Sequence, residues 1–126
     1  MMTINALGSP EDPFLGEACD ETGKKIVFNA SSVTSEYLSP RQLLEASLAG
    51  CLYITIKRIL LKREISQQKI LVQVELDSQE DVTNFKIHIE LDDQLDESLK
   101  QDIVQEAFKN SFVKNALSKP IDMHII

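Results

Sequence analysis

The 126-residue sequence predicts an α+β fold in which small antiparallel sheets pack around one long central helix. A helix-capping motif at Ser39 is followed by about 25 residues without proline. Two segments of alternating apolar and polar residues come next, and an amphipathic segment follows them. The length suits one domain, residues 1–126, in which we expect residues 1–19 to be irregular.

The first predicted strand covers residues 24–28, after a turn signal at residues 20–23. Ser9-Pro10 and Asp12-Pro13 predict loops before it. Residues 1–38 are therefore the least regular part of the chain.

The long helix is predicted from Ser39 to about Arg63, because Pro40 suits the first helical position and Gln42 completes a capping box with Ser39. Residues 43–56 are apolar on nearly every side of this helix. A helix of that kind is buried on every side. In a domain this small, a second helix or a second subunit is needed to cover it.

Residues 70–76 and 85–91 alternate apolar and polar positions, which predicts two antiparallel strands joined by a polar loop over 78–84. Asp96 is expected to cap a second helix with an apolar stripe. The stripe of this second helix consists of Leu99, Ile103, Ala107 and Phe108. A short third helix over 111–117 and a final strand over 121–125 complete the prediction.

The net charge of −7 argues against nucleic acid or an anionic membrane as a partner. Residues 39–69 nevertheless carry six bases and two acids. We favour cations at a helix C-terminus over an anion-binding patch, because no aromatic or glycine pattern accompanies them. Five of them lie near or beyond the end of the predicted helix: Lys57, Arg58, Lys62, Arg63 and Lys69.

We expect a cytoplasmic protein. The first lysine is Lys24, so the positively charged region of a signal peptide is missing, and the longest apolar stretch is too short to span a bilayer. In the cytoplasm Cys19 and Cys51 should be reduced. Together with His88 and His124 they do not match a metal-binding spacing, so we expect neither a metal nor a cofactor.

Cys51 is the most informative candidate for chemistry. A buried cysteine is often an inert core residue, but Gly50 precedes this one in mid-helix. Glycine costs about 1 kcal/mol there relative to alanine. Its presence indicates close packing of another helix or space beside the thiol.

The run from Ser39 to Leu52, with its Pro, Leu-Leu and Ala-Gly-Cys, resembles the central helix of the OsmC/Ohr (osmotically inducible protein C / organic hydroperoxide resistance) family, in its OsmC-like branch. The resemblance covers about residues 20–126. It implies an OsmC-like fold in an intertwined homodimer that responds to oxidative stress. It also implies a peroxiredoxin-like thiol peroxidase in which Cys51 is the peroxidatic nucleophile, with no cofactor besides an external thiol reductant.

The chain departs from the family pattern at functional positions. Ser111 occupies the place of the second, resolving cysteine and cannot form a disulfide. Arg41 stands where the family's more active branch has a glutamate, and Glu45, one turn on, is a possible substitute. Cys19 is a possible relocated resolving thiol, although an incidental surface cysteine is the favoured interpretation.

Two functions follow as hypotheses. The first is a thiol-dependent organic hydroperoxide reductase that acts through Cys51 alone. The second is a non-catalytic homodimer of the same fold, which binds a small hydrophobic ligand or serves a structural role.

Overall fold

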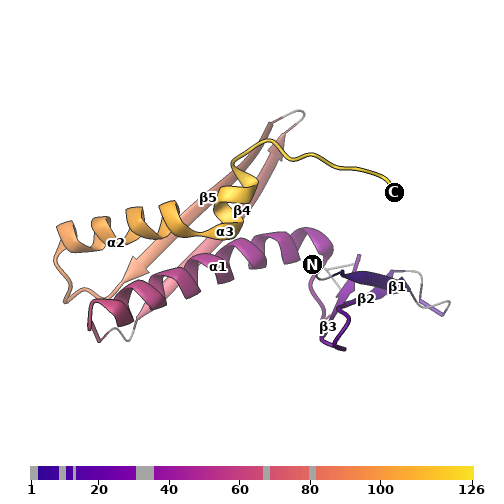
Figure 1. Cartoon of the computed structure of the whole chain (residues 1–126), viewed down its shortest axis with the longest axis horizontal. Helices are drawn as coiled ribbons and strands as arrows, with labels where there is room; N and C mark the ends of the chain where they lie inside the picture. The colour runs from indigo at the N-terminus through magenta and orange to yellow at the C-terminus, as the bar shows by residue number, and fades with distance from the viewer. Residues whose placement is uncertain (1–2, 9–10, 13, 31–35, 67–68, 80–81) are drawn as a thin grey trace. The chain divides into compact units, whose positions relative to one another are not determined.

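The computed structural model describes every residue except 1–2, 9–10, 13, 31–35, 67–68 and 80–81 (Figure 1). The chain divides into two compact units, residues 1–44 and 45–126, which are described in turn. It contains antiparallel sheets, a long helix and two shorter helices, as predicted for an α+β fold. A single domain over residues 1–126 stays a prediction.

The first unit holds a three-stranded antiparallel sheet of β1 (Asn5–Gly8), β2 (Leu15–Cys19) and β3 (Lys25–Asn29). β3 confirms the predicted strand, whereas β1 and β2 show that an irregular segment over 1–19 was wrong. These two strands are too short, and too rich in glycine and alanine, to show an alternating pattern. Their pairing with a neighbouring strand defines them instead. The loop predictions at Ser9-Pro10 and Pro13 lie outside the described residues.

The predicted turn before β3 is confirmed. The Asp20 carboxylate accepts hydrogen bonds from the backbone N–H of Thr22 at 2.9 Å and of Lys24 at 3.0 Å. Gly23 has φ +92°, a left-handed conformation that glycine adopts without steric cost. The turn therefore fixes where β2 ends and β3 begins.

The long helix, α1, covers Pro40–Lys62 and ends one residue before the predicted end. Its capping box is present: the Ser39 N–H donates to Gln42 Oε1 at 3.0 Å, and the Gln42 N–H donates to Ser39 Oγ at 3.2 Å. These bonds satisfy N–H groups that a helix start otherwise leaves unpaired.

The second unit contains a hairpin of β4 (Ile70–Gln79) and β5 (Val82–Leu91). Its register places apolar residues opposite one another, as in the Val74–Ile87 pair. Both strands are longer than predicted, so a loop over 78–84 was wrong. The backbone ladder continues through polar residues on both strands, and the alternation of apolar residues could not reveal that extension.

Two helices follow the hairpin: α2 (Glu97–Asn110) and α3 (Phe112–Leu117). Asp96 caps α2 as predicted, since its side chain accepts from the Ser98 N–H at 3.4 Å. The strand predicted over 121–125 was wrong, because the described residues after α3 form no strand. A strand requires a neighbour to complete its backbone hydrogen bonds, and this segment has none in the described chain.

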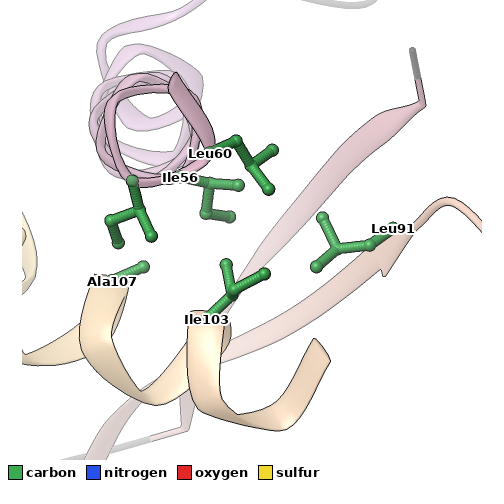
Figure 2. Close-up of a cluster of buried hydrophobic side chains, with 6 residues drawn as sticks. Ile56, Leu60, Leu91, Ile103 and Ala107 are labelled. Carbon is green, nitrogen blue, oxygen red and sulfur yellow. The ribbon is translucent and has the colours of Figure 1, made fainter. Parts of the chain in front are cut away.

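The core of the second unit lies between α1, α2 and the hairpin (Figure 2). Ile56 and Leu60 of α1 face Ile103 and Ala107 of α2, and Leu91 of β5 closes the cluster. Each fully buried leucine or isoleucine contributes roughly 1.5–3 kcal/mol. This packing holds the second half of α1 against α2.

In the chain by itself α1 is not buried on every side, and its burial by a second subunit stays a prediction. Leu52 and Ile56 are fully buried, but Tyr53 is 44% and Ile54 49% exposed. The hairpin and α2 supply cover for one side only. An apolar side of α1 is thus left facing solvent.

Candidate functional site

Cys51 lies in the middle of α1, half-buried, with a free thiol. One turn later, the Thr55 hydroxyl donates to the Cys51 carbonyl oxygen at 2.7 Å. Gly50 is exposed, and a methyl group added to it would meet no described atom within 4 Å apart from the adjoining residues and the nearby helix backbone. Within this chain, therefore, Gly50 provides open space beside the thiol-bearing residue.

Ser111 lies directly against this thiol. Its hydroxyl donates to Cys51 Sγ over 3.2 Å and accepts from the Lys114 N–H at 3.4 Å. Ser111 is fully buried and is the N-cap of α3, where its own N–H donates to the Ala107 carbonyl of α2. The junction between α2 and α3 thereby brings a hydroxyl to a sulfur sixty residues earlier in the chain.

The surroundings lower the pKa of the Cys51 thiol. Burial acts in the opposite direction and raises it, because a thiolate loses hydration there. Hydrogen bonds from the Ser111 hydroxyl and the backbone N–H groups of Val113 and Phe112 favour the thiolate and outweigh burial. The Thr55 hydroxyl also favours the thiolate, but its single proton must first turn away from the Cys51 carbonyl.

The other candidates stand at other points of the chain. Arg41 is exposed in the first turn of α1, and Glu45 is half-buried one turn later. Cys19 is a half-buried free thiol at the end of β2, opposite Lys25 in the sheet. The groups that hydrogen-bond to Cys51 come instead from Thr55 and residues 111–113.

Sequence reasoning missed the donors at Phe112 and Val113, because a backbone N–H carries no signal in residue type. It reached Ser111 only through the family resemblance, as a lost resolving residue. The capping pattern gave a usable signal, since a serine before a short helical run places its hydroxyl at the helix start. That this hydroxyl also reaches Cys51 depends on tertiary packing.

Two further polar candidates, His88 and Arg63, pair with carboxylates. His88 lies on the exposed side of β5 and hydrogen-bonds to Glu90 at 3.0 Å. Arg63, beyond the end of α1, pairs with Asp102 at 2.8 Å and Glu106 at 2.6 Å. These ion pairs link the end of α1 to α2. The preference for helix-end cations over an anion-binding patch stays a prediction.

No group of three or more His, Cys, Asp or Glu side chains in the described part of the chain could hold a metal ion. Among the same residues, no helix has the length and apolar character needed to cross a membrane.

The fold is similar to solved structures. An OsmC-like protein from Mycoplasma pneumoniae matches with a TM-score of 0.78 and 17% identity, over 94% of this chain and 87% of that one. The organic hydroperoxide resistance protein OhrB of Bacillus subtilis matches with a TM-score of 0.58 and 22% identity, over 92% and 89%. An organic hydroperoxide resistance protein OsmC from Legionella pneumophila has a TM-score of 0.65 and 18% identity, over 93% and 88%.

A comparison with curated proteins found no match. The family model described as OsmC-like protein matches residues 33–125, which include α1, the hairpin and both later helices. The match covers both Cys51 and Ser111. The chain therefore belongs to the OsmC-like protein family.

Proposed function

We propose that this protein is a thiol-dependent organic hydroperoxide reductase in which Cys51 is the single reacting cysteine. The observation that carries the proposal is the Ser111 hydroxyl donating to the half-buried Cys51 sulfur at 3.2 Å. The thiolate is the reactive form of cysteine, and these surroundings lower the pKa of the thiol. Two proteins of similar fold are named for organic hydroperoxide resistance, which supports the choice of substrate.

In the first step, the Cys51 thiolate attacks one oxygen of the hydroperoxide. The O–O bond breaks, an S–O bond forms, and the departing alkoxide takes up a proton to become an alcohol. Cys51 is oxidised to a sulfenic acid while the hydroperoxide is reduced.

In the second step, an external thiol attacks the sulfenic sulfur and releases water, leaving a mixed disulfide. A second external thiol then frees Cys51 and carries away the disulfide. Ser111 cannot replace the external thiol, because a hydroxyl forms no disulfide. The proposal requires no metal or bound cofactor.

We further propose a cytoplasmic homodimer in which a second copy covers the exposed side of α1. Tyr53 and Ile54 are the large apolar side chains left exposed there. Ile121, Met123 and Ile125 are exposed as well, and they keep the alternation of a strand without a partner. A second copy that covers both the exposed side of α1 and the C-terminal segment would remove substantial apolar area from water.

The alternative is a non-catalytic homodimer that binds a small hydrophobic ligand or is structural. The observation that favours it is the serine at position 111, where the family resemblance implies a resolving cysteine. Under this hypothesis the Cys51–Ser111 hydrogen bond serves only packing.

Consumption of cumene hydroperoxide by the purified protein, with dithiothreitol as reductant, separates these hypotheses. The reductase proposal expects rapid loss of peroxide in the wild type and background loss in Cys51→Ser. Cys19→Ser is the matched comparison and should retain the rate if the external thiol acts directly on Cys51. A wild-type rate no higher than that of Cys51→Ser would favour the non-catalytic alternative.

A further inference from the structure

The Ser111 hydroxyl makes two hydrogen bonds, one as an acceptor through its oxygen and one as a donor through its proton. Its oxygen accepts the Lys114 N–H at the start of α3, at 3.4 Å. Its single proton is donated to Cys51 Sγ, at 3.2 Å. Capping therefore uses a lone pair and leaves the proton for the sulfur.

Two features hold this proton in place. Ser111 is fully buried, so solvent water does not compete for the hydroxyl. Its backbone is anchored as well, because its N–H donates to the Ala107 carbonyl and its carbonyl accepts from Asn115. A buried hydroxyl without an acceptor is costly, and Cys51 Sγ supplies that acceptor.

The bond distinguishes the two forms of Cys51. A thiol sulfur is a weak acceptor, whereas a charged acceptor makes a hydrogen bond roughly twice as strong as a neutral one does. The Phe112 and Val113 N–H groups follow Ser111 directly and also favour the charged sulfur. The cap thus presents a set of donors to the sulfur.

We propose that Ser111 is a positioning residue that directs its hydroxyl proton at Cys51 and favours the charged form of its sulfur for reaction with hydroperoxide. Ser111 stands where the family resemblance implies a resolving thiol. In this proposal it acts on the Cys51 sulfur before oxidation, whereas a resolving thiol acts on the sulfenic acid afterwards. This inference rests on the proposed function for its role in a reaction. The effect of Ser111 on the thiol can be measured without that reaction.

The test is the pH profile of Cys51 alkylation by iodoacetamide, with Cys51 and Cys19 distinguished by mass spectrometry. Ser111→Ala should raise the pKa of Cys51 by about one pH unit, and so lower the alkylation rate below that pKa about tenfold. Ser111→Thr keeps a hydroxyl and should restore most of the rate. Asp96→Ala is the matched control, because it removes the cap of α2 without touching Cys51.

An unchanged Cys51 profile in a folded Ser111→Ala protein would overturn the proposal. The proposal would also fail if Asp96→Ala shifted the profile as far, since the effect would then reflect general loosening. Should Ser111→Ala fail to fold, Ser111→Gly takes its place, because glycine is tolerated at a helix N-cap and also removes the hydroxyl. A raised Cys51 pKa in that variant supports the role, and an unchanged one refutes it. If the profiles behave as expected but the wild type consumes no peroxide, only the proposed function fails.

Discussion

The Ser111 hydroxyl lies 3.2 Å from the Cys51 sulfur, although sixty residues separate the two in the chain. Ser111 begins α3, and Cys51 lies in the middle of α1. The packing of α1 against α2 brings these elements together (Figure 2). A residue at position 111 is thus placed to act on the thiol, and its chemistry decides how.

Ser111→Cys should give the protein a resolving thiol. The two side chains already lie within hydrogen-bond distance, so a small adjustment allows an S–S bond of about 2.05 Å. After one equivalent of cumene hydroperoxide, we expect an intrachain disulfide between positions 51 and 111. Peptide mapping under non-reducing conditions would detect it, with Ser111→Ala as control. A variant that forms only mixed disulfides with added thiols would contradict the placement of residue 111.

Peroxide consumption should depend on pH through Cys51. The pKa of this thiol is lowered, so the reactive thiolate predominates from a lower pH than in a free cysteine. The rate should rise as pH increases toward that pKa and level off above it. Stopped-flow rates across the pH range, beside N-acetylcysteine as reference, would measure both midpoints. A midpoint at or above that of the reference would show that burial outweighs the donors.

Ile103→Ala should destabilise the second unit by about 2–5 kcal/mol. Ile103 is fully buried between α1 and the hairpin, and its truncation leaves a cavity (Figure 2). Leu61→Ala is the matched control, because Leu61 is 65% exposed and its loss should cost much less. Urea unfolding followed by circular dichroism would give both values. Equal losses would mean that Leu61 is buried in solution, as in a dimer.

Ile54→Glu should weaken self-association. Ile54 is 49% exposed on the uncovered side of α1, and a carboxylate there would be buried by a second copy. Sedimentation equilibrium should give twice the 14.2 kDa chain mass for the wild type and a shift toward one chain for the variant. Gln101→Glu, an exposed change on α2 that adds the same charge, should remain a dimer. A wild type that sediments as a single chain would refute the proposed assembly.

The sequence predicted elements whose signals are local. The Ser39–Gln42 capping box, the Asp96 cap and the alternation along the hairpin all depend on neighbouring residues, and the structure confirms each. β1 and β2 could not be predicted, because their pairing partners define them. The strand predicted at 121–125 failed for the converse reason, since its pattern is present but no partner lies in the described chain.

The same distinction applies to the site. Cys51 was identified from the chain itself, because a glycine beside a cysteine in mid-helix is unusual. The role of Ser111 as a hydrogen-bond donor depends on how α3 follows α2, and no local pattern encodes it. The donors at Phe112 and Val113 are backbone groups that any sequence could supply at those positions.

Gly50→Ala tests what the mid-helix glycine is for. Alanine should stabilise α1 by about 1 kcal/mol. Apart from the adjoining residues and the nearby backbone of α1, no described atom lies within 4 Å of the added methyl group. Any loss of stability must therefore come from a contact with another molecule.

Gly50 precedes Tyr53 and Ile54 by three and four residues, which places all three on one side of α1. If a second copy packs closely on that side, the methyl group should weaken the dimer although the helix itself gains stability. Sedimentation equilibrium would measure the dissociation constant, with Gln105→Ala on α2 as control. A variant that is about 1 kcal/mol more stable, with unchanged association, would show that Gly50 is not needed for a contact between subunits.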